Sequence, residues 1–179
     1  EGLPKIAYIY FAGGEPLVQP EHYALLRELI RLGRTDVVLA YNTNMSVTAL
    51  KDDSIFELWK PFPRVSVEAS VDAAGELGAL MRSGFDWKVF AANVRALKEA
   101  CPHVGLHYGV TVSVMNVMAL PELFAALGSE LGAGPGDIYL HSLQDPEFYR
   151  TQVMPPELKA KAAAGLRVAG LSCITNMAA

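Results

Sequence analysis

The sequence predicts an α/β fold with parallel strands, arranged as a partial (β/α) barrel of the TIM type. Short apolar runs rich in Val, Ile and aromatic residues alternate with segments of helical periodicity. Each apolar run ends in Gly, Asn, Asp or Ser, which is typical of strands that lead into turns. Parallel neighbours need crossovers of this kind. Because no glycine-rich dinucleotide fingerprint and no phosphate-binding loop follows any strand, a barrel is favoured over a Rossmann or nucleotide-triphosphatase fold.

The first half of the chain gives three strands and three helices. The run 6–11 is rich in Ile, Tyr and Phe and ends at Gly13-Gly14, as a buried strand entering a turn does. A helix over 20–32 follows, since leucines recur at helical spacing between Pro20 and Gly33. The remaining expected elements are a strand over 37–40, a helix over 54–59, a strand over 65–71 and a helix over 86–100.

The second half continues the alternation. The expected elements are a strand over 104–114, a helix over 121–131, a strand over 138–143 and a helix over 155–164 that begins with proline. Residues 171–174 are expected to start one more strand. The stretch 132–136 resembles a linker but is too short to divide domains, so residues 1–179 are expected to form a single domain.

Composition limits the classes of partner. A net charge of −4 gives no long-range attraction to nucleic acid or to an anionic membrane. No apolar run approaches the roughly 20 residues that cross a bilayer, and the sequence contains only two distant cysteines, Cys101 and Cys173. Their spacing fits neither a metal site nor a redox pair. The chain is therefore expected to be cytoplasmic, without a metal site of its own and without nucleic-acid or membrane partners.

Polar residues follow the predicted strands, where ligands collect in parallel α/β folds. Gly-Gly-Glu-Pro ends the first strand, and two residues without a Cβ let a ligand approach the backbone closely. The ionised side chain of Glu15 suits an ammonium group held at that turn. The candidate site residues at these strand ends are Gly13, Gly14, Glu15, Pro16, Asn44, Ser70, Asp72, Ser113, Asn116 and His141. We expect the strand-end members of this set to converge on one concave mouth.

Four motifs in this order resemble the radical S-adenosylmethionine (radical SAM) enzymes. Residues 10–16 (YFAGGEP) are similar to the motif after that family's second barrel strand, and residues 41–44 (YNTN) follow the next strand. Ser70-Val71-Asp72 is similar to the family's serine–aspartate strand end. Residues 82–87 (RSGFDW), followed by a helix containing Asn93, most resemble the subgroup with a twitch or SPASM accessory domain, whose members often modify peptides. The resemblance covers roughly the second to the sixth strand of the barrel.

The resemblance implies a role for each candidate residue. Gly13, Gly14 and Glu15 would bind the ammonium group of S-adenosylmethionine, and Ser70 with Arg82 its carboxylate. Asp72 or Asn44 would meet the ribose hydroxyls. The residues expected near the adenine are Val112, Ser113 and Asn116, with His141 and Leu143 on the far side of the same mouth.

In this family a CxxxCxxC loop after the first strand holds a [4Fe–4S] cluster. The chain has no such loop, so the cluster ligands are expected upstream of Glu1 in a longer parent protein. That parent would be an enzyme that reductively cleaves S-adenosylmethionine to a 5′-deoxyadenosyl radical. The radical would abstract hydrogen from a substrate, for which a peptide is one class, and an electron donor protein would be a partner. The 179-residue chain alone is expected to be inactive.

Two other functions stay open at this point. A binding module that has dispensed with the cluster would use the same strand ends to hold a metabolite or peptide. A barrel enzyme of aldolase or isomerase type would need a lysine or paired carboxylates at the strand ends. Glu68 lies within a predicted strand and Lys98 within a predicted helix, so both are poorly placed for such chemistry.

Overall fold

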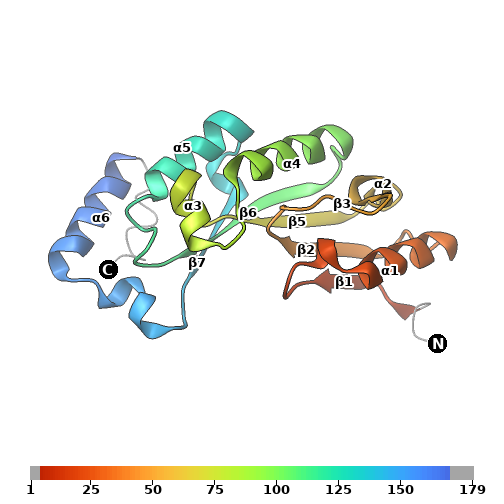
Figure 1. The fold of residues 1–179 in the computed structure, drawn as a ribbon, viewed down its shortest axis with the longest axis horizontal. Helices are drawn as coiled ribbons and strands as arrows, with labels where there is room; N and C mark the ends of the chain where they lie inside the picture. The colour runs from red at the N-terminus through yellow and green to blue at the C-terminus, as the bar shows by residue number, and fades with distance from the viewer. Residues whose placement is uncertain (1–4, 170–179) are drawn as a thin grey trace. The chain divides into compact units, whose positions relative to one another are not determined.

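The computed structural model describes residues 5–169 and has the predicted α/β architecture (Figure 1). A five-stranded parallel sheet has the order β1-β2-β5-β6-β7, so the main strands are neighbours in the order in which the chain makes them. These strands are β1 (Tyr8–Phe11), β2 (Val38–Thr43), β5 (Val65–Ser70), β6 (Gly105–Val112) and β7 (Ile138–Ser142). The predicted strand order is confirmed. The strand expected at 171–174 lies outside the described residues.

The helices expected from periodicity are present with small changes in their ends. They are α1 (Pro20–Arg31), α2 (Ile55–Trp59), α4 (Trp87–Ala100), α5 (Leu120–Leu131) and α6 (Pro156–Val168). Helix α5 ends because Gly132 takes a left-handed conformation, with φ +65°. Single turns of 3-10 helix cover Pro16–Val18, Pro135–Asp137, Glu147–Tyr149 and Thr151–Val153.

Three local features differ from the sequence-based expectation. Strand β2 continues to Thr43, whereas residues 41–44 were expected to be a loop, because Asn42 and Thr43 pair in parallel register with β5. A small antiparallel pair, β3 (Ala49–Leu50) and β4 (Asp53–Ser54), precedes α2. An unpredicted helix, α3 (Gly75–Met81), follows β5. These elements are short, so hydrophobic periodicity carries little information about them.

The described chain divides into two compact units. The first consists of the chain up to Ser70 together with Lys88–Tyr108, and the second of Val71–Trp87 together with the chain from Gly109. In the first unit β1, β2 and β5 run side by side, with β1 paired to β2 and β2 to β5 in parallel (Figure 1). That the whole chain behaves as one domain stays a prediction.

The core of the first unit contains a cluster of aromatic rings. The ring of Tyr41 stacks on Phe11 with centroids 4.8 Å apart, and its hydroxyl lies 3.0 Å from His22 Nε2. Burial lowers the pKa of His22 to about 4, because the charged imidazolium would lose its hydration. Trp59 is fully buried beside Tyr41, at a centroid distance of 4.9 Å. This packing holds β1 and β2 together, and the candidate residues Gly13, Gly14, Glu15 and Asn44 follow the ends of these two strands.

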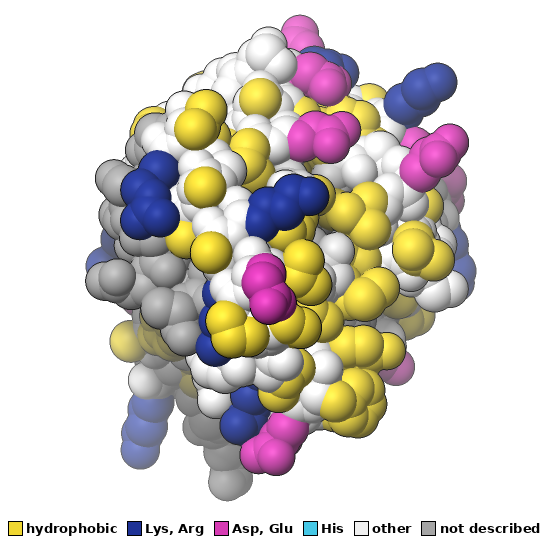
Figure 2. All heavy atoms as spheres, turned by 90° about the vertical axis from the view of Figure 1, so that its left-hand side faces the viewer, with side chains coloured by type: hydrophobic (Ala, Val, Ile, Leu, Met, Phe, Trp, Pro, Cys, Tyr) yellow, Lys and Arg dark blue, Asp and Glu magenta, His cyan; other side chains and the backbone are white. Residues whose placement is uncertain are grey.

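One face of the surface carries both charged and apolar side chains. On the face shown in Figure 2, Lys and Arg side chains are interspersed with Asp and Glu, and hydrophobic side chains lie among both. Among residues 5–169, no helix combines the length and the apolar character that spanning a membrane requires.

Candidate functional site

The turn after β1 is the centre of the first group of candidate residues. Gly13 and Gly14 have φ of +81° and +57°, a backbone conformation that residues with a side chain rarely adopt. Apart from the glycine and its two chain neighbours, no described residue has a heavy atom within 4 Å of the position where a Cβ would stand at either glycine. Both residues are exposed, and within the described chain neither carbonyl oxygen accepts a hydrogen bond. The turn therefore presents free backbone acceptors to a ligand.

The side chain of Glu15 links this turn to the end of β2. Its Oε1 accepts hydrogen bonds from Thr43 Oγ1 at 2.6 Å and from the Leu17 backbone N–H at 3.2 Å. Its Oε2 accepts the Asn44 backbone N–H at 2.8 Å. The carboxylate is thus held by donors of the protein itself. Pro16 is buried and opens the 3-10 turn behind it.

Two other candidates belong to the same unit. The Asn44 side-chain oxygen accepts the Ser46 backbone N–H at 2.9 Å, so this side chain shapes the loop after β2. Ser70 is the last residue of β5 and is half-buried. Both therefore lie at or just after strand ends, as the sequence predicts.

Asp72 is the centre of the second group, which lies in the second unit. Its Oδ1 accepts the Thr111 backbone N–H at 2.8 Å, and its Oδ2 accepts Arg82 Nε at 2.7 Å. The Asp72 side chain is 11% exposed and that of Arg82 32%, so this ion pair is partly shielded from water. Because Nε is occupied by Asp72 and the terminal amino groups of Arg82 have no partner in the described chain, those groups remain available to an anion.

Asn116 is fully buried and all of its side-chain polar atoms are used. Its Nδ2 donates to the carbonyl oxygens of Asp72 at 2.8 Å and Thr111 at 2.9 Å. Its Oδ1 accepts the Ser113 backbone N–H at 2.8 Å. The amide therefore ties the segment after β6 to the segment after β5, and it acts on the site through the backbone that it holds.

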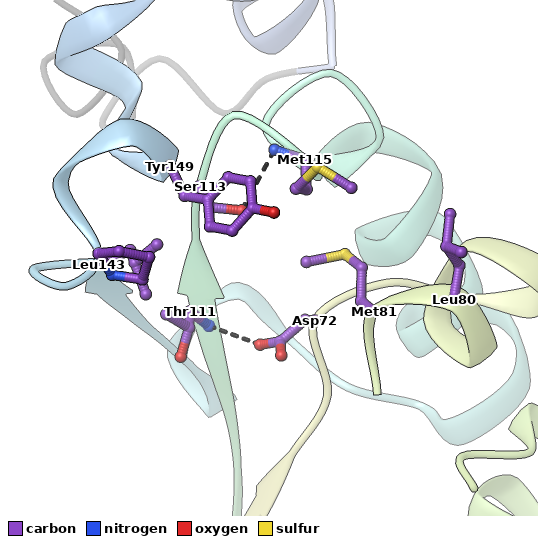
Figure 3. A pocket seen from close by; sticks show the side chains of 9 residues that line it. Asp72, Leu80, Met81, Thr111, Ser113, Met115, Leu143 and Tyr149 are labelled. Atoms are coloured by element: carbon purple, nitrogen blue, oxygen red, sulfur yellow. Dashed lines mark hydrogen bonds between the residues drawn. The ribbon is translucent and has the colours of Figure 1, made fainter. Parts of the chain in front are cut away.

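A pocket of about 310 Å³ lies beside this network. Asp72 faces Thr111 at its base, while Met81 and Leu80 lie on one side and Leu143 and Tyr149 on the other (Figure 3). The hydroxyls of Thr111 and Tyr149 have no hydrogen-bond partner among the described residues. Ser113 Oγ, also at the pocket, accepts the Met115 backbone N–H at 3.2 Å. The pocket combines apolar walls with a few polar groups, as sites for small organic ligands do.

His141 has a different position. It is exposed on β7, and the residues that line the pocket include Leu143, two positions further along the chain, instead. Because the candidate residues are divided between the two units, their convergence on one mouth stays a prediction. Sequence reasoning missed the pocket residues Leu80 and Met81, which lie in the unpredicted helix just before Arg82.

The described residues do not fit an iron–sulfur cluster. Within residues 5–169, no group of three or more His, Cys, Asp or Glu side chains is arranged to hold a metal ion. Cys101 is buried, burial raises its pKa, and its Sγ lies 3.3 Å from the Phe56 carbonyl oxygen. A buried thiol of this kind packs as a small hydrophobic group. Cys173 lies outside the described residues.

Comparison with known proteins supports the fold. The chain matches no protein-family model and no curated protein. Among solved structures it is similar to a domain of pyruvate-formate lyase-activating enzyme from Bacteroides vulgatus ATCC 8482, with a TM-score of 0.52 and 18% sequence identity. The similarity covers 91% of this chain and 94% of that domain. At this identity it establishes a shared α/β fold.

Proposed function

We propose that the chain is the S-adenosylmethionine-binding core of a radical SAM enzyme. In the complete protein, reductive cleavage of S-adenosylmethionine would lead to hydrogen abstraction from a substrate, for which a peptide is one class. The α/β fold shared with the activating-enzyme domain supports this proposal. We further propose that the cluster ligands lie outside this chain, since the described residues do not fit a cluster.

The observation that carries the proposal is the turn at Gly13 and Gly14. Exposed glycines with positive φ and unused carbonyl oxygens suit an ammonium group, which needs several acceptors at close range. The adenosyl group of the same ligand needs an apolar site with a few polar contacts. The pocket lined by Met81, Leu143 and Tyr149 has that character and suits an adenosyl group.

The chain's own residues would bind and orient the ligand. Bound S-adenosylmethionine would supply the adenosyl group used in the radical reaction. The hydroxyls of Thr111 and Tyr149 are the free polar groups of the pocket, and Ser70 and Arg82 are the residues proposed for the carboxylate.

Equilibrium binding of S-adenosylmethionine to the full-length protein tests this assignment. Leu143→Trp should fill part of the pocket and weaken binding, whereas Val153→Trp, at a side chain that is 55% exposed and outside the pocket, should not. Ser70→Ala should cost on the order of 1–3 kcal/mol, or about 5- to 150-fold in Kd, because the bound ligand loses a polar partner. Wild-type affinity in both Leu143→Trp and Ser70→Ala would refute the proposed site.

The gene upstream of Glu1 separates this proposal from its alternative. A CxxxCxxC motif there would support the enzyme, because it would supply the cluster ligands that the described residues lack. A reading frame that starts near Glu1 would instead support a binding module without a cluster.

A further inference from the structure

The loop after β2 contains a strained residue. Met45 has φ +52° and a side chain with no exposed surface. A left-handed backbone is disfavoured for a residue with a Cβ, because the Cβ comes too close to the following carbonyl oxygen. Such a conformation persists only where surrounding contacts impose it. The contacts that impose this conformation on Met45 therefore indicate a role for the loop.

Side chains bind both backbone polar groups of Met45. Its N–H donates to Thr43 Oγ1 at 3.1 Å, and its carbonyl oxygen accepts Asn93 Nδ2 at 2.7 Å. Asn93 lies on α4, far along the chain but within the same compact unit. The loop is thus fastened to a long helix by one amide group.

The network continues from the loop to the glycine turn. Thr43 Oγ1, which accepts the Met45 N–H, donates its own hydrogen to Glu15 Oε1 at 2.6 Å. The Asn44 backbone N–H donates to the other oxygen of the same carboxylate at 2.8 Å. One continuous path therefore joins α4 to the turn after β1.

We propose that Asn93 and Glu15 are positioning residues, which hold the turn so that the Gly13 and Gly14 carbonyl oxygens accept a ligand's ammonium group. This inference rests on the proposed function. It assigns Glu15 a role that acts through the backbone, since its carboxylate already accepts three donors of the protein. The ligand class that this turn selects is an amino acid moiety, as opposed to the nucleoside alone.

The test compares two nucleosides on the full-length protein. S-adenosylmethionine carries the amino acid moiety, and 5′-methylthioadenosine lacks it. Asn93→Ala should raise the Kd of S-adenosylmethionine about tenfold, the equivalent of about 1.4 kcal/mol, and leave that of 5′-methylthioadenosine within about twofold. Asn42→Ala is the matched control, since this β2 side chain has no hydrogen-bond partner in the described residues.

Hydrogen exchange gives a readout that needs no ligand. In Asn93→Ala, amide exchange should accelerate at residues 43–46 and 13–17, because both segments depend on the same network. If Asn93→Ala does not fold, Glu15→Gln carries the same test from the other end of the path. In Glu15→Gln an amide NH₂ group replaces one of the two acceptor oxygens, so the same selective loss of affinity for S-adenosylmethionine is expected.

The outcomes separate this inference from the proposed function. Equal weakening of both nucleosides would show that Asn93 is merely structural, and unchanged affinity for S-adenosylmethionine would show that the turn does not need it; either result overturns the inference alone. A wild-type protein that binds neither nucleoside overturns the proposed function and this inference together. Selective loss of S-adenosylmethionine affinity with faster exchange at both segments is the supporting result.

Discussion

Replacing Asn116 with alanine should destabilise the second unit severely. The substitution removes two donated hydrogen bonds, to the carbonyl oxygens of Asp72 and Thr111, and two accepted ones, from the Ser113 N–H and, at a long 3.4 Å, from Ser113 Oγ. The side chain has no exposed surface, so water cannot readily replace it. Each buried group left without a partner costs about 1–3 kcal/mol. The carbonyl oxygens fall at the low end, because each keeps a second lone pair.

The sum for Asn116→Ala is about 3–5 kcal/mol, a large part of the 5–15 kcal/mol that stabilises an ordinary domain. Urea denaturation of the purified chain, followed by far-UV circular dichroism, measures it, with the slope m checked for each variant. Asn42→Ala is the control and should change the free energy of unfolding by less than about 0.5 kcal/mol.

A second variant tests the direction of the hydrogen bonds. Asn116→Asp preserves size but turns the donor toward Asp72 and Thr111 into an acceptor, so it should destabilise at least as much as alanine. The reasoning fails if Asn116→Ala lies within about 0.5 kcal/mol of wild type, or if Asn116→Asp is as stable as wild type.

Three further predictions concern stability and activity. Between pH 7 and 5 the free energy of unfolding of the wild type should fall by about 2 kcal/mol, a loss that His22→Gln should not show. The His22 pKa falls from 6.5 to about 4 on folding, so only the unfolded chain binds the proton in that window. Equal pH profiles of the two proteins would contradict this. Gly78→Ala should destabilise the protein by about 1–3 kcal/mol, because the added Cβ would lie 2.4 Å from a backbone oxygen. Gly165→Ala, where an added Cβ would meet nothing within 4 Å, should instead stabilise α6 by about 0.5–1 kcal/mol. Thermal melts of both variants measure these changes. The 179-residue chain alone should neither assemble a [4Fe–4S] cluster nor cleave S-adenosylmethionine after anaerobic reconstitution, since it has only two cysteines; release of methionine and 5′-deoxyadenosine would disprove it.

The candidate site was only partly predictable from the sequence. The Gly13-Gly14 turn could be predicted because it depends on two adjacent residues that tolerate positive φ. The hydrogen bonds of the Glu15 carboxylate could not be predicted, since its partners Thr43 and Asn44 are 28 and 29 positions away in the chain. The same holds for Asn116, whose buried partner Asp72 is 44 positions away. The twitch or SPASM subgroup stays a prediction.

The α/β class, the order of the strands and most helices could be predicted from local patterns of residues, because hydrophobic periodicity and Gly or Pro breaks act over a few residues. The tertiary structure extends β2 to Thr43, because a parallel partner strand must lie beside this segment to bind its backbone groups. It also decided that Asn93 on α4 holds the strained loop at Met45. Such contacts depend on which segments are brought together, and no local pattern of residues encodes that.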